Sequence, residues 1–202
     1  MENQIKAVIF DGDGMVINGE MFYLDLVRNF GSKAEVFNPF YANEFQLCLV
    51  GKADLKDELK KYLEALGYDS HVDEFIKHWF RSEHSVDEGI VNYIKELRDK
   101  GIRCYLATNQ EKYRSAYMRE EMDFDNLFDG IFFSCELGYI KPQQEFYHAV
   151  SERLEKDGIK KDEVIFWDDR EKNISETENY GFKAALYRNF GNFLEVMSSY
   201  GI

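Results

Sequence analysis

Positive charge and long apolar runs are both in short supply in this sequence. Its 25 Lys and Arg residues face 38 Asp and Glu residues, which gives a formal net charge of −13 at pH 7. Nucleic acids and anionic membrane surfaces attract Lys- and Arg-rich faces, so we expect neither as a partner. No apolar run approaches the roughly 20 residues that a membrane-spanning helix needs. Net charge does not fix the sign inside one pocket, so a small phosphorylated substrate stays compatible with the composition.

Cysteine is scarce and irregularly placed. The three cysteines, Cys48, Cys104 and Cys135, are odd in number and lack the spacing of a metal site. We therefore expect reduced thiols in a cytoplasmic protein. A strand-like stretch begins at about Ile5, which leaves no room for a signal peptide and agrees with that location. The histidines also lack ligand or catalytic spacing, and we expect all four to be structural: His71, His78, His84 and His148.

Short apolar runs alternate with amphipathic helical patterns along most of the chain. Strands are expected at residues 5–10, 102–107, 130–134, 163–167 and 183–187. Helices are expected at residues 87–99, 111–121, 143–156, 171–180 and 190–199. In the first of these helices, Ile90, Ile94 and Leu97 share one face, and Gly101 follows its end. The alternation predicts an α/β fold with a doubly wound, Rossmann-like parallel sheet.

The alternation is broken once, between residues 18 and 86, where no convincing strand occurs. Helical patterns cover residues 20–30, 39–49, 54–66 and 71–82 instead. This is more chain than a single crossover connection requires. We therefore expect a core domain at residues 1–17 and 87–202, and a small all-helical cap domain at residues 18–86. The alternative is that these helices simply cover one face of the sheet.

Polar residues gather where the predicted strands end. In a doubly wound sheet, ligands bind outside the carboxyl ends of the strands. Lys141 lies in a loop before Pro142, which we expect in the first turn of the next helix. Together the candidate residues are Asp11, Asp13, Thr108, Asn109, Lys141, Asp168 and Asp169.

Asp11 and Asp13 pose the sharpest chemical question, because two carboxylates so close together repel each other. Unless something neutralises the pair, one of them should have a raised pKa, and a cation is the simplest neutraliser. A carboxylate at the end of a central strand can attack phosphorus and form an aspartyl-phosphate, a role that we assign to Asp11. Asp13 is placed to protonate the leaving oxygen and then to deprotonate the water that resolves the intermediate.

The other candidates complete a phosphoryl-transfer site. Asp169, Asp11 and the backbone carbonyl of Asp13 can hold an octahedral Mg²⁺, which prefers hard oxygen ligands. We expect the Thr108 hydroxyl, with Asn109 beside it, to bind phosphoryl oxygens. Lys141 supplies a positive charge against the charge that spreads over those oxygens in the transition state.

At these residues the sequence resembles the haloacid dehalogenase superfamily of phosphohydrolases. The first motif of that family, Asp-x-Asp-Gly after an apolar strand, is matched by "DGDG" at residues 11–14. Thr108 in "YLATNQ" matches the second motif, Lys141 in "ELGYIKP" the third, and "FWDDREKN" the acidic fourth. The resemblance covers nearly the whole chain. It implies a Mg²⁺-dependent hydrolase of phosphate monoesters with a cap inserted after the first motif.

The sequence departs from the family pattern at a few positions. Met15 replaces the usual Thr or Val, and Gly12 is unusually small for a residue between the two acids. Asn173 stands where a third acid is common, and we expect it to support the site without touching the metal; a helix-surface Asn is the alternative. Asp168 is expected to bind the metal through water or to orient Lys141.

Three other classes of protein fit this sequence less well. An EF-hand calcium loop starting at Asp11 requires Gly and Glu where Val16 and Phe22 stand, and it would follow a helix. A phospho-acceptor receiver domain carries its acceptor Asp on the third strand, and no acid ends the strand at 130–134 here. A catalytically inactive binding or regulatory protein on the same fold would be expected to lose a key group, and none is lost.

Within the family, dehalogenases lack the equivalent of Asp13, which favours phosphate chemistry. We predict a phosphomonoester hydrolase acting on a small phosphorylated metabolite, possible examples being sugar phosphates. A mutase resembling β-phosphoglucomutase is the alternative, although Asp54 stands about where such mutases carry an Arg. Lys52 is the candidate cap contact with substrate, followed by Glu20 and Tyr23. The sequence does not specify an oligomeric state, and a monomer is compatible with it.

Overall fold

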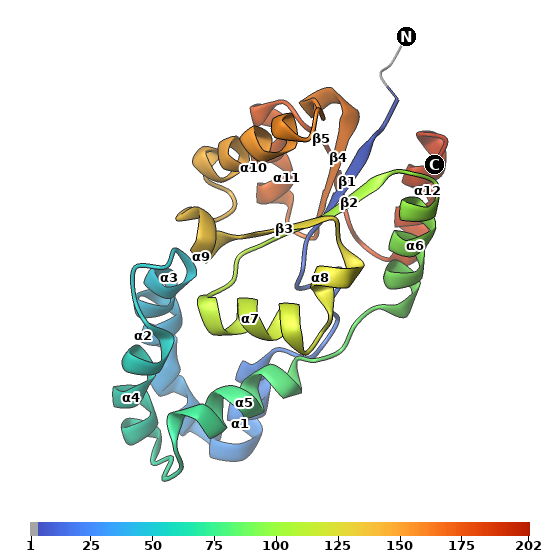
Figure 1. Cartoon of the computed structure of the whole chain (residues 1–202). Coiled ribbons are helices and arrows are strands. Elements are labelled where there is room, and N and C mark those ends of the chain that lie inside the picture. Colours follow the sequence, from blue (N-terminus) through green and yellow to red (C-terminus); the bar gives the residue numbers. More distant parts are fainter. Residues whose placement is uncertain (1–3) are drawn as a thin grey trace.

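A five-stranded parallel sheet lies at the centre of the computed structural model, which describes residues 4–202 (Figure 1). Its strands are β1 (Ala7–Phe10), β2 (Arg103–Thr108), β3 (Gly130–Phe133), β4 (Val164–Asp168) and β5 (Lys183–Leu186). They lie in the order β3-β2-β1-β4-β5, so that β1 is central and the chain crosses to the other side of it after β3. The predicted strands and the doubly wound, Rossmann-like sheet are thus confirmed.

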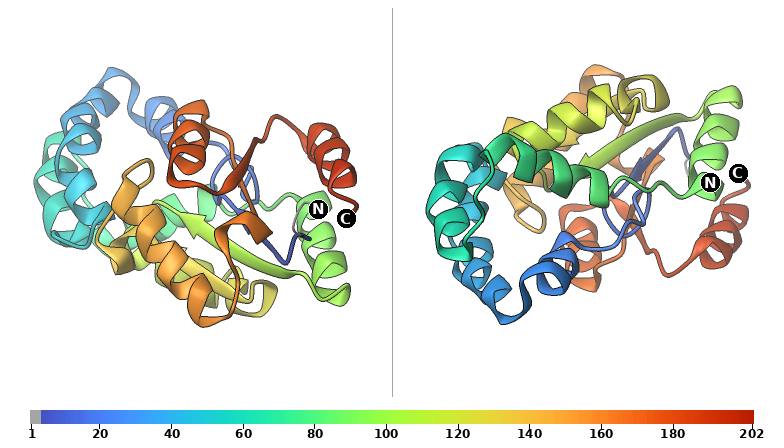
Figure 2. Two further views of the ribbon diagram at one scale, coloured as in Figure 1. Left: turned by 90° about the horizontal axis from the view of Figure 1, so that it is seen from above. Right: turned by 90° about the horizontal axis from the view of Figure 1, so that it is seen from below.

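Helices cover both faces of this sheet, because the side chains of each strand point alternately to one face and the other. Val8 and Phe10 pack into one apolar cluster with α6 (Glu88–Asp99), α7 (Lys112–Glu120), α8 (Phe124–Leu127) and α12 (Phe190–Ser199). Ala7 and Ile9 face the opposite cluster, which includes α10 (Gln144–Lys156). α11 (Glu171–Tyr180) also lies on that side and contacts α10, β4 and β5. Figure 2 shows these layers from two directions.

The segment after β1 forms a separate group of helices at one end of the molecule (Figures 1 and 2). It comprises α1 (Phe22–Phe30), the 3-10 helix η1 (Gly31–Phe37), α2 (Asn38–Ala42), α3 (Glu44–Leu49), α4 (Leu55–Leu66) and α5 (Val72–Ser82). These helices surround an apolar cluster of their own, distinct from the two clusters on the sheet. Phe22 and Trp79, for example, stack at 5.3 Å between ring centroids. The helices therefore form a cap and do not cover a sheet face.

The predicted helix over residues 39–49 is wrong in one respect, because it is divided into α2 and α3. Asn43 separates them with φ −121° and ψ −79°, which are not helical values. Its side chain donates to the carbonyl oxygen of Pro39 at 2.9 Å, so a polar side chain satisfies the end of α2 and the chain turns there.

Two linkers connect the cap to the core, and they run side by side. The backbone N–H of Asn18 donates to the carbonyl of Ser85 at 2.9 Å, and that of Asp87 donates to Val16 at 2.9 Å. Ile17 and Val86 form an isolated antiparallel bridge between these bonds. The pairing supports a division of the chain near residues 18 and 86, which stays a prediction; residues 1–3 of the predicted core domain lie outside the described residues.

Pro142 was expected in the first turn of a helix, and this prediction is wrong. α10 begins at Gln144, and Gln143 is its extended N-cap residue, with ψ 138°. Pro142 instead follows Lys141 through a cis peptide bond in the preceding turn. Lys141 is thereby part of a tight loop between α9 (Ser134–Leu137) and α10.

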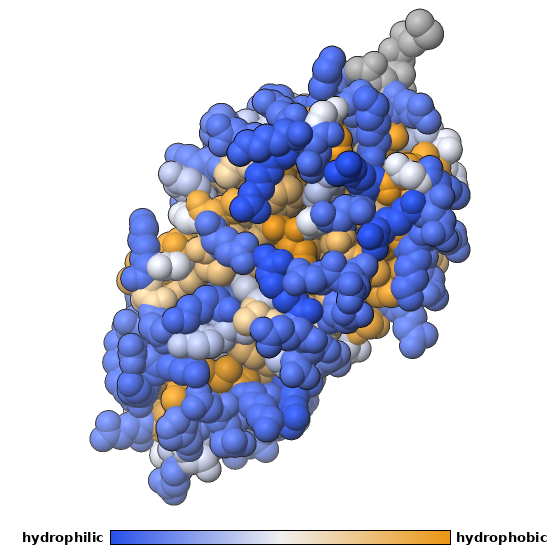
Figure 3. Space-filling view, in the orientation of Figure 1, coloured by the Kyte–Doolittle hydropathy of each residue, from blue (hydrophilic) through white to orange (hydrophobic). Residues whose placement is uncertain are grey.

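The surface seen in Figure 3 is mostly hydrophilic, with apolar side chains scattered between charged ones. Across residues 4–202, no helix is both long enough and apolar enough to cross a membrane. The remaining helical element, the 3-10 turn η2 (Lys161–Glu163), leads into β4 at the opposite end of the sheet from the cap.

Candidate active site

The carboxyl ends of the three central strands bring the predicted polar residues together. Phe10 of β1 is in register with Leu106 of β2 and Trp167 of β4, so Asp11 and Asp168 lie at the same level and Thr108 lies one residue further along β2. The backbone N–H of Asp11 donates to the carbonyl of Trp167 at 3.0 Å. Asp11, Thr108 and Asp168 therefore meet at the edge of the sheet that faces the cap.

Lys141 joins this group from its loop and makes the central contact of the site. Its Nζ donates to Asp11 Oδ1 and to Asp168 Oδ2, both at 2.7 Å. All three side chains are buried, with Lys141 only 4% exposed. Burial disfavours the ammonium, but the attraction of both carboxylates outweighs it and raises the pKa of Lys141. Burial raises the pKa of Asp11 to about 7, and Lys141 only partly opposes this. The site carries more buried negative charge than Lys141 neutralises.

A set of amide and backbone groups fixes Lys141 and Asp168 in place. The Asn109 amide donates to the Lys141 carbonyl at 3.0 Å, and its Oδ1 accepts from the Lys141 N–H at 2.8 Å. Asp168 Oδ1 accepts from Asn173 Nδ2 at 2.8 Å and from the Arg170 N–H at 3.0 Å. Asn173 is buried, which excludes the alternative of a helix-surface side chain. Both polar atoms of the Asn109 side chain are bonded to the backbone of Lys141. A contact of Asn109 with phosphate stays a prediction.

Three carboxylates fit a divalent cation. One oxygen from each of Asp11, Asp168 and Asp169 lies within 4.8 Å of the others. Hard carboxylate oxygens are the donors that Mg²⁺ prefers. Both oxygens of Asp168 already accept hydrogen bonds, so Asp11 and Asp169 are the better candidates for direct ligation. Burial, followed by the charge of Asp168, raises the pKa of Asp169, and a bound cation would relieve this.

The loop that carries Asp11 and Asp13 packs closely on its neighbours through glycine. A Cβ atom on Gly12 would lie 2.8 Å from Thr108 Oγ1. Gly14 has φ +88°, and a Cβ there would overlap the Asp169 carboxylate. The small residue between the two acids thus has a physical reason: it lets the loop approach Thr108, which is 2% exposed.

Asp13 differs from the other acids because its side chain is 54% exposed. Its Oδ2 accepts from Gln110 Nε2 at 2.6 Å, and Arg114 Nη2 lies 3.8 Å from its Oδ1. Sequence reasoning missed both partners. A signal existed for Gln110, which lies two residues after Thr108 in the same loop, whereas Arg114 sits in the first turns of α7 and gave none.

The predicted cap residues make few contacts with this group. Glu20 is exposed and pairs with Arg28 at 2.5 Å, while Tyr23 packs edge-on against Tyr41. Lys52 is exposed and follows Gly51, where a Cβ atom would lie 2.7 Å from the Cys135 carbonyl oxygen of the core. Substrate contact by these residues stays a prediction.

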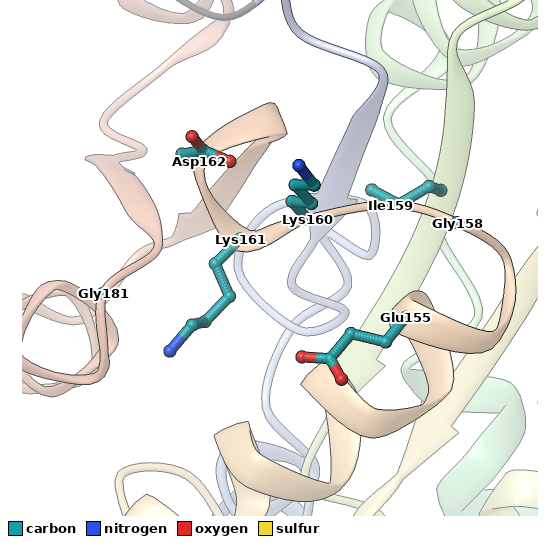
Figure 4. Close-up of a pocket in the computed structure, with 7 residues that line it drawn as sticks. All are labelled: Glu155, Gly158, Ile159, Lys160, Lys161, Asp162 and Gly181. Carbon is teal, nitrogen blue, oxygen red and sulfur yellow. The ribbon is translucent and has the colours of Figure 1, made fainter.

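A separate surface pocket lies at the other end of β4, beside η2 (Figure 4). Lys160, Lys161 and Glu155 line it, and Lys161 donates to the Tyr180 carbonyl at 3.2 Å. It contains none of the predicted site residues, so the candidate site is the carboxylate group at the sheet edge.

Glu111 offers a test of buried charge next to the site. It is 2% exposed, caps α7 by accepting from the N–H groups of Tyr113 and Arg114, and burial raises its pKa to about 7. The folded state therefore binds a proton more tightly than the unfolded state, so the stability that this group contributes is complete below about pH 4.5 and declines toward pH 7.

Glu111→Gln keeps an acceptor and removes the charge. We compare the change in the free energy of unfolding that this substitution causes at pH 8 with the change that it causes at pH 4.5. The change at pH 8 should be more stabilising by up to about 3 kcal/mol. Urea unfolding at both pH values measures this; an equal effect at both would contradict it.

Comparisons with known proteins agree with this geometry. A family model described as a haloacid dehalogenase-like hydrolase matches residues 5–179. A phosphorylated carbohydrates phosphatase of Thermotoga maritima is 23% identical over 186 residues, covering 89% of this chain and 83% of that protein. A HAD-like family hydrolase from Porphyromonas gingivalis shares the fold with a TM-score of 0.78 at 19% identity, covering 98% of both chains. A HAD family enzyme from Bacteroides thetaiotaomicron, solved with magnesium and inorganic phosphate, gives 0.76 at 20% identity over 91% of this chain and 94% of that one.

Proposed function

Because the chain belongs to the haloacid dehalogenase-like hydrolases, we propose that it hydrolyses the phosphate monoester of a small metabolite through an aspartyl-phosphate on Asp11. The observation that carries the proposal is the buried contact of Asp11 and Asp168 with Lys141, with Asp169 beside them. A structural ion pair would need one acid for one lysine. Here three acids and one lysine share a site at the mouth of the central strand, which is the arrangement that phosphate and a cation would complete.

The first chemical step follows from the position of Asp11. One Asp11 oxygen forms a bond to phosphorus as the bond from phosphorus to the ester oxygen breaks, and Asp13 gives its proton to that leaving oxygen. Lys141, Thr108 and the adjacent backbone N–H groups hold the phosphoryl oxygens. In the second step Asp13 takes a proton from water, the water oxygen attacks phosphorus, and the bond to Asp11 breaks. Free phosphate and the original Asp11 carboxylate result.

Asp11, Asp169 and the backbone carbonyl of Asp13 would hold Mg²⁺. When bound, the ion offsets the negative charge of the acids and of the phosphate, so that two anions can approach each other. This agrees with the raised pKa of both Asp11 and Asp169, since each marks a carboxylate whose charge is not yet balanced.

A sugar phosphate is the substrate class that we favour, since one relative is named a phosphorylated carbohydrates phosphatase. A cap next to the site suits a small substrate, because closure excludes water and large polymers. The mutase alternative gains no support from Asp54. That carboxylate accepts from Lys112 and Tyr113 of the core, so it docks the cap on the core, and an acid stands where a mutase carries an Arg.

Phosphate release with and without Mg²⁺ tests the proposal. We expect the purified protein to release inorganic phosphate from at least one member of a panel of sugar phosphates, nucleotides and phosphoglycolate. EDTA should lower the rate by at least about 100-fold, because the cation supplies several kcal/mol of charge stabilisation, and Mg²⁺ should restore it. Asp169→Asn should raise the Mg²⁺ concentration that gives half-maximal rate, whereas Asp57→Asn on the exposed face of α4 should not. Hydrolysis that is equally fast in EDTA would contradict the metal, and conversion of glucose 1-phosphate to glucose 6-phosphate would favour the mutase.

A further inference from the structure

A buried arginine with an unpartnered nitrogen lies between the cap and Asp13. Arg114 is 3% exposed, and its Nη2 has no hydrogen-bond partner within the described part of the chain. A buried donor left unpaired costs about 1–3 kcal/mol, so its presence calls for a reason. The nearest anionic atom recorded for Nη2 is Asp13 Oδ1 at 3.8 Å, less than 1 Å beyond a hydrogen bond.

The guanidinium of Arg114 also contacts the cap and its second linker. Nη1 donates to the Phe80 carbonyl at 3.1 Å, at the end of α5, and lies 3.4 Å from Glu83 Oε2. The guanidinium also lies over the Phe80 ring at 5.4 Å. Glu83 in turn accepts from the backbone N–H of Phe22, the first residue of α1. One arginine of the core thus contacts the end of the cap directly, is connected to the start of the cap through Glu83, and faces Asp13.

Gln110 holds Asp13 from the other side, and it too is connected to the cap. It is 5% exposed, and its Nε2 donates to Asp13 Oδ2 at 2.6 Å. Its backbone N–H donates to Ser134 Oγ at 2.9 Å, and the same hydroxyl lies 2.6 Å from the Leu49 carbonyl at the end of α3. Asp13 therefore lies between two residues that are each connected to a different helix of the cap: Gln110 to α3 through Ser134, and Arg114 to α5 directly.

We propose that Gln110 and Arg114 are positioning residues that aim the Asp13 carboxylate at the leaving oxygen and couple its orientation to the position of the cap. This inference rests on the proposed function. Gln110 fixes one oxygen of Asp13. Arg114 is shared between Glu83 on the cap linker and Asp13, so a shift of the cap that releases Glu83 lets Nη2 close the remaining distance to Oδ1. Misplacement of a catalytic group by about 1 Å can cost about 100-fold in rate, which sets the scale of the effect.

The test exploits the leaving group. Departure of p-nitrophenolate from p-nitrophenyl phosphate needs little protonation, whereas departure of an alkoxide from a sugar phosphate needs a well-aimed acid. In Gln110→Met and Arg114→Met we expect kcat/KM for a sugar phosphate to fall by about 30–100-fold, and for p-nitrophenyl phosphate by several-fold at most. Arg114→Lys, which keeps the charge, should recover part of the loss. Because kcat/KM covers only the steps up to departure of the leaving group, the later hydrolysis of the phospho-enzyme does not blur the comparison.

Two controls separate positioning from a structural role. Arg119→Met removes another arginine of α7, one that pairs with Asp125 and Glu136 away from Asp13. It should not lower kcat/KM for the sugar phosphate more than kcat/KM for p-nitrophenyl phosphate. In an Asp13→Asn background, Gln110→Met should produce no further loss, since the group that it positions is already absent.

Equal losses on both substrates, or full additivity with Asp13→Asn, would overturn the inference. Circular dichroism would show whether Arg114→Met folds. If it does not, Gln110→Met and Arg114→Lys still test whether these residues position Asp13. A wild-type protein that hydrolyses neither substrate would instead count against the proposed function.

Discussion

Asp11→Asn is expected to lower kcat for phosphate release by at least about 10⁴-fold, since removal of a nucleophile in a comparable covalent mechanism costs about 10⁶. The amide nitrogen and oxygen of Asn cannot form a stable bond to phosphorus in place of the carboxylate. The fold should persist, because Asn has nearly the same volume and its oxygen can still accept from the Gly12 N–H, which lies 2.6 Å from Asp11 Oδ1. Lys141 also keeps Asp168 as a partner.

Steady-state rates with the preferred substrate measure this loss, and thermal unfolding reports the fold. The matched control is Asp57→Asn, an exposed acid of α4 whose ion pair with Lys60 is on the surface. A direct probe is borohydride reduction of the enzyme during turnover, which converts an aspartyl-phosphate to homoserine. Mass spectrometry should then locate homoserine at position 11. Activity of the Asn variant within tenfold of wild type, or a homoserine elsewhere, would exclude Asp11 as the nucleophile.

Lys141→Met is expected to remove activity and to lower the free energy of unfolding by about 3–5 kcal/mol, the usual cost of breaking a buried pair by removal of one partner. Asp11 and Asp168 would then be left as two buried carboxylates without a cation. At least one of them would have to bind a proton in the folded state. The loss of stability should therefore be smaller at pH 5 than at pH 8, because proton uptake is easier there.

Urea unfolding in EDTA at both pH values measures the effect without a contribution from a bound metal. Lys77→Met, at an exposed position of α5, is the matched control and should change stability by less than about 0.5 kcal/mol. The double variant Lys141→Met/Asp168→Asn should recover part of the stability and none of the activity, because it removes one of the unpaired charges. Unchanged stability in Lys141→Met would show that the lysine does not hold the carboxylates.

The strands of the sheet could be predicted because each is specified by a short stretch of neighbouring residues. Each strand is a short apolar run that ends in a polar residue, as "AVIF" before Asp11 and "VIFW" before Asp168 show, and burial on both faces makes such runs continuous. The meeting of Asp11, Thr108 and Asp168 followed from one rule about parallel strands. Lys141 was predicted from its place in a loop near these strand ends and from its match to the third family motif, although nothing in its own loop shows that it reaches the other strands.

The misses concern turns and hydrogen bonds that hydrophobic periodicity does not reveal. The division at Asn43 and the start of α10 at Gln144 are local: Asn43 donates to the Pro39 carbonyl four residues earlier, and Gln143 is the extended N-cap residue of α10. The partner of the Asn109 side chain is more distant, since it is the backbone of Lys141, 32 residues away. The side-chain amide of Asn109 holds the backbone of Lys141, and a contact of Asn109 with phosphate stays a prediction.

The residue order alone determined which strands form, which acids and which lysine stand at their ends, and that the chemistry is suited to phosphate, because these depend on periodicity and residue type. The tertiary structure decided what surrounds Asp13. Gln110 and Arg114 lie about a hundred residues away from it in the chain, as contacts across a parallel sheet require. They reach it only because β2 is beside β1 and α7 is under the cap. The side chains that surround a charged group come from segments distant in the chain, so no single stretch of sequence specifies them.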